Sequence, residues 1–107
     1  AISKAISYIE ESGFPDKSIK ELADMCSLSM GYFERLFKEY SGMTAKDYVS
    51  EKKMFYIKEL LHNERITLEE IAEKTKCCDS GYLCRIFKKK TGMTPGEYRK
   101  LYFAKKF

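Results

Sequence analysis

The chain contains one segment twice. Residues 31–48 read GYFERLFKEYSGMTAKDY and residues 81–98 read GYLCRIFKKKTGMTPGEY, and these are identical at nine of eighteen positions. Chance would give about one identity, so the match indicates an internal repeat. The similarity extends upstream, where SIKELADM from Ser18 aligns with TLEEIAEK from Thr67 at an offset of 49, which becomes 50 before Asp79. The repeat predicts two similar units with different residues at some positions of a shared frame.

Helix signals run through both copies. Apolar residues recur at helical spacing, and glycines at 42 and 92 provide the expected ends of the longer helices. Three of the helix starts read S/T-x-x-E, the capping-box pattern, at Ser18, Thr67 and Thr94, and Thr44 is followed by Asp47 at the same spacing. The predicted helix starts are Ser18, Ser29, Thr44, Thr67, Asp79 and Thr94. A further helix is predicted before these, over residues 2–12, ending at Gly13 and Pro15.

The apolar positions of these helices predict their buried faces. In the first copy the stripe on the longer helix is Phe33, Leu36, Phe37 and Tyr40, and in the second it is Leu83, Ile86 and Phe87. Between the copies, residues 45–61 contain no proline or glycine and would form a rod of about 25 Å at 1.5 Å per residue. The expected buried side of this rod is Tyr48, Met54, Ile57, Leu60 and Leu61.

The length and composition suit a globular helical domain. The chain has 107 residues, of which 44% are hydrophobic and 34% are charged, and no apolar run approaches the roughly 18 residues of a membrane span. We therefore expect a cytoplasmic protein without a membrane segment. The chain opens inside a predicted helix, so we expect it to be part of a longer protein.

Basic charge is concentrated at one end. The net charge is +4, but residues 85–107 hold eight Lys and Arg against one Glu, a net of +7, which leaves −3 for the other 84 residues. Basic charge beside a repeat favours a polyanionic partner. A lysine-rich segment that is only a solvated face is the alternative.

Catalytic and metal-binding signatures are missing from the sequence. The four cysteines are Cys26, Cys77, Cys78 and Cys84, without a CxxC pair, and His62 is the single histidine. Structural zinc needs four well-spaced ligands, so we expect no metal and no cofactor, and reduced thiols. The chain also lacks a phosphate-binding glycine loop and an H-E-x-x-H motif, so we do not expect an enzyme.

A short capped helix, a tight turn and a longer helix with one polar face form the helix-turn-helix pattern, and here it occurs twice. The segments LADMCSLSMGYFERLFKEYSGMTAKDYV and IAEKTKCCDSGYLCRIFKKKTGMTPGEYRK resemble the DNA-binding domain of AraC/XylS-type transcription regulators over nearly the whole chain. The G-x-T-P-x-x-Y-R ending at Arg99 is among the more specific signatures. The resemblance implies that the second helix of each unit enters the major groove, in successive grooves on one face of the DNA.

The predicted organisation is one DNA-binding domain over residues 1–107. It is all-α with about seven helices, in which two helix-turn-helix subdomains are joined by a long linker helix. Subdomain one covers residues 1–43 with its helix-turn-helix at 18–42, the linker helix covers 44–61, and subdomain two covers 62–107 with its helix-turn-helix at 67–92.

The resemblance also assigns residues to the interface. Those expected to contact bases are Met30, Gly31, Glu34, Arg35, Ser80, Gly81, Cys84 and Arg85. The residues expected to contact phosphates, through hydroxyl or ammonium groups, are Ser29, Tyr32, Lys38, Tyr82, Lys88 and Lys89. An arginine can bind a guanine edge through two hydrogen bonds, although Arg35 or Arg85 could instead pair with a carboxylate such as Glu34 or Glu39. With about six phosphates neutralised, log affinity should fall with log salt at a slope of about −5.

The sequence departs from the family pattern in several places. Lys76 and Cys77 stand where Gly-Phe is usual in the second turn, and Gly31 and Gly81 stand where larger residues are usual. The long helix has Lys53 and Ile57 where arginine and alanine are frequent. The second unit is therefore expected to be less stable or to dock differently.

The sequence predicts sequence-specific binding of double-stranded DNA at an asymmetric site by a bacterial transcription regulator. The alternative is a protein-interaction module that docks on RNA polymerase or an effector domain. We expect an additional N-terminal effector or receiver domain and a monomeric fragment.

Overall fold

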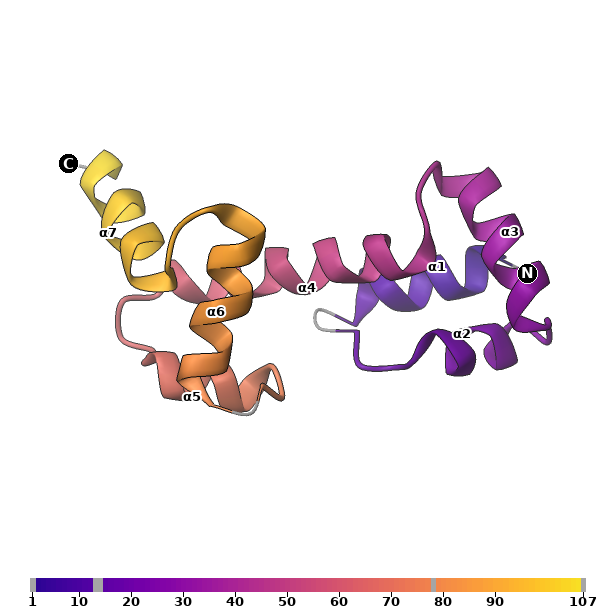
Figure 1. The fold of residues 1–107 in the computed structure, drawn as a ribbon, viewed down its shortest axis with the longest axis horizontal. Helices are drawn as coiled ribbons and strands as arrows, with labels where there is room; N and C mark the ends of the chain where they lie inside the picture. The colour runs from indigo at the N-terminus through magenta and orange to yellow at the C-terminus, as the bar shows by residue number, and fades with distance from the viewer. Residues whose placement is uncertain (1, 13–14, 78, 107) are drawn as a thin grey trace. The chain divides into compact units, whose positions relative to one another are not determined.

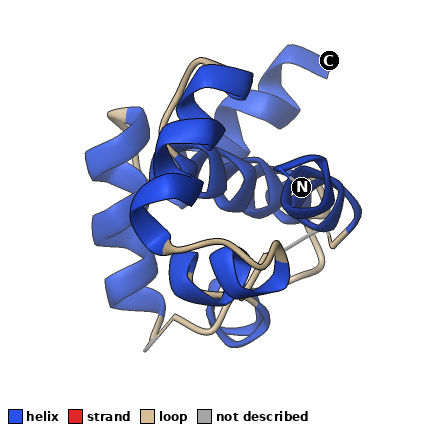
Figure 2. Cartoon of the chain, turned by 90° about the vertical axis from the view of Figure 1, so that its right-hand side faces the viewer, coloured by secondary structure: helices blue, strands red, loops and turns tan. Residues whose placement is uncertain are grey.

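A computed structural model gives the fold of residues 2–12, 15–77 and 79–106. These residues form seven helices and no strand (Figures 1 and 2), which confirms the predicted all-α fold. The helices are α1 (Ile2–Glu11), α2 (Ile19–Met25), α3 (Met30–Ser41), α4 (Ala45–Leu61), α5 (Leu68–Lys74), α6 (Ser80–Thr91) and α7 (Pro95–Lys106). None of them is long and apolar enough to cross a membrane. The stop predicted at Gly13 lies outside the described residues.

The chain divides into two compact units within α4, between Lys53 and Met54. The first unit holds α1, α2, α3 and the first half of α4, and the second holds the rest of α4 with α5, α6 and α7 (Figure 1). Each unit has its own hydrophobic core, and the pairs α2–α3 and α5–α6 are the two copies of the repeat.

In the first unit, α1 packs against α2 and α3, and α2 packs against α3. The rings of Phe33 and Phe37 are fully buried at the centre, and Phe37 meets the ring of Tyr48 edge-on at 5.4 Å. The buried core residues of this unit are Ile2, Ala5, Ile9, Leu22, Ala23, Cys26, Phe33, Phe37, Ala45 and Val49. Burial of apolar side chains on this scale is the main stabilising contribution to a small helical unit.

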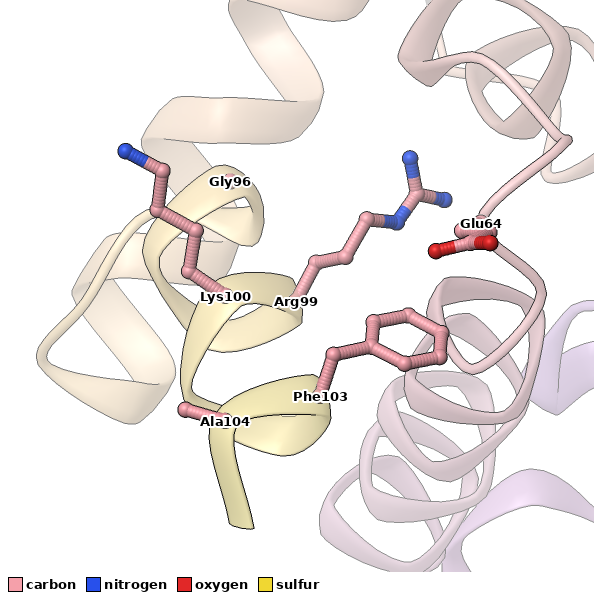
Figure 3. Close-up of a pocket in the computed structure, with 6 residues that line it drawn as sticks. All are labelled: Glu64, Gly96, Arg99, Lys100, Phe103 and Ala104. Carbon is pink, nitrogen blue, oxygen red and sulfur yellow. The ribbon is translucent and has the colours of Figure 1, made fainter. Parts of the chain in front are cut away.

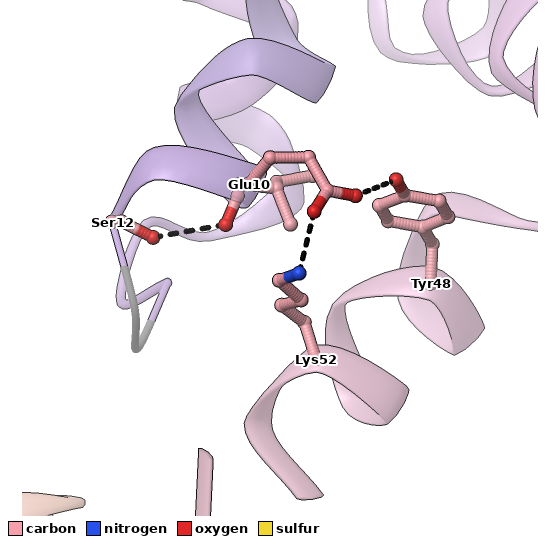
Figure 4. A network of polar contacts seen from close by, with 5 residues as sticks. Glu10, Ser12, Tyr48 and Lys52 are labelled. Carbon is pink, nitrogen blue, oxygen red and sulfur yellow. Dashed lines mark hydrogen bonds and ion pairs between the residues drawn. The ribbon is translucent and has the colours of Figure 1, made fainter. Parts of the chain in front are cut away.

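A polar cluster ties α1 to the first half of α4. The carboxylate of Glu10 accepts hydrogen bonds from the Tyr48 hydroxyl and from the Lys52 ammonium group (Figure 4). The bonds from Lys52 and Tyr48 hold the pKa of Glu10 below its usual value. The bond to Glu10, together with burial, raises the pKa of Tyr48 to about 12. Beside this cluster, the Ser12 hydroxyl donates to the Ile9 carbonyl oxygen at 3.2 Å.

The second unit repeats this packing. α5 packs against α6, α6 packs against α7, and Phe87 meets the ring of Tyr98 edge-on at 5.6 Å, as Phe37 meets Tyr48. The buried core residues are Ile57, Leu61, Ile66, Ile71, Ala72, Leu83 and Phe87. Thr75 is also buried, and its hydroxyl donates to the Ile71 carbonyl oxygen at 2.8 Å, so its polar atom is satisfied.

Helix starts lie where the sequence places them. Each predicted capping side chain accepts a hydrogen bond from the backbone N–H three residues on, at 2.7 to 3.3 Å. These residues are Ser18, Ser29, Thr44, Thr67, Asp79 and Thr94. The predicted ends of α3 and α6 are also confirmed, because Gly42 and Gly92 adopt left-handed backbone with φ of 84° and 85°.

The turn of each helix-turn-helix uses a non-glycine residue in the left-handed region. Ser27 has a φ of 58° and Lys76 a φ of 59°. In each turn the following N–H bonds five residues back, from Leu28 to Ala23 at 3.0 Å and from Cys77 to Ala72 at 2.9 Å. The missing glycine of the second turn is thus replaced by Lys76 in the same strained conformation, at a cost of roughly 1 to 2 kcal/mol.

One detail of the predicted burial is wrong and another is incomplete. Tyr40, expected in the α3 stripe, is 69% exposed, because Phe37 is the last buried residue of that helix and the final turn lies beyond the core. In α4, Ala45 and Val49 are buried although they were not expected to be. This helix contributes to two separate cores, so its buried residues do not form a single stripe.

Candidate nucleic-acid interface

Helix α3 leaves one polar face in solvent. Its buried side is fixed by Phe33 and Phe37, which have no exposed surface. The opposite face carries the residues expected to contact bases, and all of them are exposed. They are Met30, Gly31, Glu34 and Arg35, and Lys38 continues the same face one turn later. The predicted face of the first unit therefore exists as an accessible surface.

Helix α6 presents the equivalent face. Leu83 and Phe87 are its fully buried residues. Of the residues expected to contact bases, Gly81 and Arg85 are exposed, while Ser80 and Cys84 are half-buried. Lys88 and Lys89 are exposed in the last turn. This face is thus more basic than that of α3, and it has smaller side chains around its arginine.

Both arginines rest on a tyrosine of their own helix. The Arg35 guanidinium carbon lies 5.1 Å from the centre of the Tyr32 ring, and the Arg85 carbon lies 5.7 Å from the centre of the Tyr82 ring. Neither guanidinium pairs with a carboxylate among the described residues. The ion pair with Glu34 or Glu39 that the sequence left open is therefore not formed.

Helices α3 and α6 begin with different charges. The Ser29 hydroxyl accepts from the Tyr32 N–H at 3.3 Å and keeps its own proton for another acceptor. The Asp79 carboxylate accepts from the Tyr82 N–H at 2.7 Å and places a negative charge at the start of α6. A helix N-terminus favours anions, but a carboxylate there opposes the approach of a phosphate. The start of α3 therefore repels an approaching anion less than the start of α6 does.

The glycines at equivalent positions have different surroundings. A Cβ on Gly31 would meet nothing within 4 Å, whereas a Cβ on Gly81 would lie 3.2 Å from Asp79 Oδ1. Gly81 therefore leaves room for the capping carboxylate. Gly31 has no such neighbour, so nothing within this unit requires a glycine at that position.

The described cysteines, Cys26, Cys77 and Cys84, are thiols rather than disulfides. No group of His, Cys, Asp and Glu in the described part of the chain is arranged to hold a metal ion. Cys78 lies outside the described residues. Only Cys84 belongs to the α6 face, where its small side chain is half-buried.

Arg99 has a structural contact that the sequence did not predict. Its Nε donates to the Leu61 carbonyl oxygen at 3.1 Å, and its Nη2 donates to the Asn63 carbonyl oxygen at 3.2 Å. An open groove beside it is lined by Glu64, Gly96, Arg99, Lys100, Phe103 and Ala104 (Figure 3). In that view Arg99 and Phe103 extend toward Glu64, whereas Lys100 extends away. Arg99, one of the basic residues near the end of the chain, thus links α7 to the end of α4 within the second unit.

Comparison with known proteins agrees with this architecture. A family model described as a helix-turn-helix domain matches residues 22–101. The C-terminal domain of the two-component response regulator YesN from Fusobacterium nucleatum is 33% identical, with a TM-score of 0.79 over 91% of this chain and 95% of that one. Regulatory protein PocR of Salmonella typhimurium is 30% identical over 98 residues, which cover 92% of this chain. The DNA-binding domain of AdpA, solved with a target DNA, shares the fold at 19% identity, with a TM-score of 0.84 over 97% of this chain and 94% of that one.

The fold, in which α3 and α6 each present an exposed polar face, defines a double helix-turn-helix domain. The chain belongs to the AraC/XylS-type family of transcription regulators and corresponds to the DNA-binding domain of its members. It spans 32% of the length of PocR and less than half of other curated relatives that it matches.

Proposed function

We propose that this domain binds double-stranded DNA sequence-specifically at an asymmetric site, with α3 and α6 in successive major grooves. The observation that carries the proposal is the pair of exposed faces on these helices. Each has an arginine in the same register, at Arg35 and Arg85, but different residues around it. Equal arginines beside unequal neighbours would prefer different bases in the two halves of a site.

Each polar side chain then has a role that its exposure supports. Arg35 and Arg85 would bind guanine edges through two hydrogen bonds each, and Met30, Gly31, Glu34, Ser80, Gly81 and Cys84 would face neighbouring bases. Phosphates would be held by Ser29, Lys38, Lys88 and Lys89, and by the hydroxyls of Tyr32 and Tyr82. None of these roles involves a chemical step, so the proposed function is not enzymatic.

We further propose that the whole of residues 1–107 acts as one DNA-binding domain, with α4 as the linker between its subdomains. A longer chain would add an effector or receiver domain, because relatives are about two to three times as long. The site of action would be bacterial DNA in the cytoplasm, and the isolated domain would be a monomer.

Retention of a labelled duplex by charge variants tests the proposal. Arg85→Ala and Lys88→Ala should each weaken binding, and Lys88→Ala should also reduce the salt slope by about one unit. Lys90→Ala is the matched control, since Lys90 is exposed on the same helix but lies about 200° around it from Lys88. Unchanged retention for Arg85→Ala and Lys88→Ala would contradict DNA binding by α6. It would favour a module that docks on RNA polymerase or an effector domain.

A further inference from the structure

We propose that Tyr32 and Tyr82 are positioning residues, whose rings orient Arg35 and Arg85 for base recognition. This inference rests on the proposed function and assigns the tyrosines a role that does not depend on their hydroxyl groups. Its starting point is the same contact in both units, with guanidinium carbon to ring centre distances of 5.1 Å and 5.7 Å. Both distances lie within the range of about 6 Å in which a cation is attracted to an aromatic face.

Helix geometry explains why the contact forms. The arginine follows the tyrosine by three residues, so the two side chains are neighbours on the same helix surface. Side chains on an α-helix lean toward its N-terminus, and a long arginine side chain therefore lies back over the residue one turn before it. The stack is built from a single helix and is independent of how the two units are placed.

The tyrosine stands on a fixed piece of backbone. Its N–H is the group that the helix cap binds, to Ser29 Oγ at 3.3 Å in α3 and to Asp79 Oδ1 at 2.7 Å in α6. The ring thus projects from the first turn, where the cap has set the backbone. The cap therefore holds the tyrosine backbone, and the tyrosine ring in turn supports the arginine.

The ring does not belong to either hydrophobic core cluster. Tyr32 is 44% exposed and Tyr82 is 40% exposed, while the next residues, Phe33 and Leu83, are fully buried and fill the interior. The neighbours of the pair differ between the copies, with Glu34 in one and Cys84 in the other. The tyrosine and the arginine are kept together although the residues between them change.

The expected consequence is that the arginine side chain loses less conformational freedom when the domain binds DNA. An exposed arginine samples many rotamers, and each ordered side chain reduces the net affinity. A guanidinium that lies over a ring occupies fewer orientations than one that extends freely into solvent, and its N–H groups project from the edges of its own plane. Loss of an exposed cation–π contact corresponds to about two- to fivefold weaker binding. The loss should appear as a weaker preference at the base pair that the arginine contacts.

The experiment compares Tyr82→Phe, Tyr82→Leu and Arg85→Ala on one preferred duplex and on duplexes changed at single base pairs. The base pair at which Arg85→Ala abolishes the preference is the reference position. At that position Tyr82→Leu should lower the preference about two- to fivefold, whereas Tyr82→Phe should retain it. Preferences at the base pairs that respond to Arg35→Ala should not change in either Tyr82 variant.

Two results would overturn the inference while leaving the proposed function intact. One is a Tyr82→Leu domain with the wild-type preference at the reference position. The other is a Tyr82→Phe domain that loses as much as Tyr82→Leu, which would assign the effect to a hydroxyl–phosphate contact. If Arg85→Ala itself changed no preference, the proposed function would fail as well. Tyr32→Phe and Tyr32→Leu provide the same comparison in the first unit, should a Tyr82 variant fold poorly.

Discussion

The guanidinium of Arg99 binds the carbonyl oxygen of Leu61, the last residue of α4, across 38 positions of sequence. The final carbonyl groups of a helix lack partners within the helix and carry partial negative charge. Arg99 supplies both a donor and a positive charge there, and a second donor reaches Asn63. The contact fastens α7 to the end of α4 inside the second unit.

Replacement of Arg99 by lysine should therefore destabilise the domain. A lysine cannot make two diverging hydrogen bonds from a planar group, so the free energy of unfolding should fall by about 1 kcal/mol. Denaturant unfolding measures the change. Lys100→Arg is the control, because Lys100 is exposed and extends away from this contact, and it should change the free energy by less than about 0.5 kcal/mol. Equal stability of Arg99→Lys and the wild type would show that the two bonds contribute nothing.

The cluster of Glu10, Tyr48 and Lys52 predicts a pH-dependent stability. The folded-state pKa of Glu10 is lowered by its bonds to Lys52 and Tyr48, so its contribution is present above the unfolded pKa and is lost as the pH falls through the lowered folded value. Because the pair is partly exposed, Glu10→Gln should cost only about 0.3 to 1 kcal/mol at pH 7. The difference from the wild type should shrink as the pH falls below the ordinary glutamate pKa and disappear only below the lowered folded value. Thermal unfolding across pH measures it, with Glu11→Gln as the exposed control.

Tyr48 gives the opposite dependence. Its pKa is raised to about 12 by the bond to Glu10, so its contribution is complete below the ordinary tyrosine value of 10.0 and is lost as the pH rises through the folded value. The free energy of unfolding of the wild type should therefore fall between these two pH values. Tyr48→Phe has no hydroxyl to titrate and should not show this fall. An identical alkaline profile for the two proteins would mean that the hydroxyl bond to Glu10 is not maintained in solution.

The two recognition-helix glycines should respond differently to alanine. Gly31→Ala has open space and should raise stability by up to about 0.5 kcal/mol, because alanine favours a helix. Gly81→Ala must displace the Asp79 carboxylate and should gain less or lose stability. If the α3 backbone approaches the base edges, Gly31→Ala should also weaken DNA binding despite the more stable fold. Unfolding and duplex titration together distinguish these effects.

The charge at the start of α6 should limit DNA affinity. Asp79→Ser keeps a good helix cap but removes the negative charge, so affinity should rise about two- to fivefold at low salt and less at high salt. Ser29→Asp is the reciprocal change in α3 and should lower affinity by a similar factor. Titrations at two salt concentrations measure both variants. A decrease for Asp79→Ser would indicate that the carboxylate accepts a hydrogen bond from the DNA.

Local chemistry explains what the sequence predicted well. Helix bounds follow from caps and glycines that act within four residues, as Ser18 and Gly42 do, and the exposed faces of α3 and α6 follow from the spacing of Phe33, Phe37, Leu83 and Phe87. The repeat added a second copy of every signal. These features could be read without knowledge of the tertiary structure.

Contacts between distant segments could not be predicted in this way. The exposure of Tyr40 depends on where the core ends, and the role of Arg99 depends on the position of Leu61. The stacks of Arg35 on Tyr32 and of Arg85 on Tyr82 were within reach of the sequence, since both pairs are three residues apart. The signal is the recurrence of tyrosine and arginine at one spacing, whereas the family resemblance assigns the arginines to bases and the tyrosines to phosphate without a contact between them.

Selection of binding sites from a random duplex pool tests the two-helix proposal most directly. The wild-type domain should enrich an asymmetric site whose two halves lie about 10 base pairs apart, one helical turn of DNA. Arg35→Ala should relax one half and Arg85→Ala the other, each by about 1 to 3 kcal/mol of discrimination. A pool that stays random at low salt, or a site whose two halves both survive the loss of either arginine, would contradict recognition by α3 and α6.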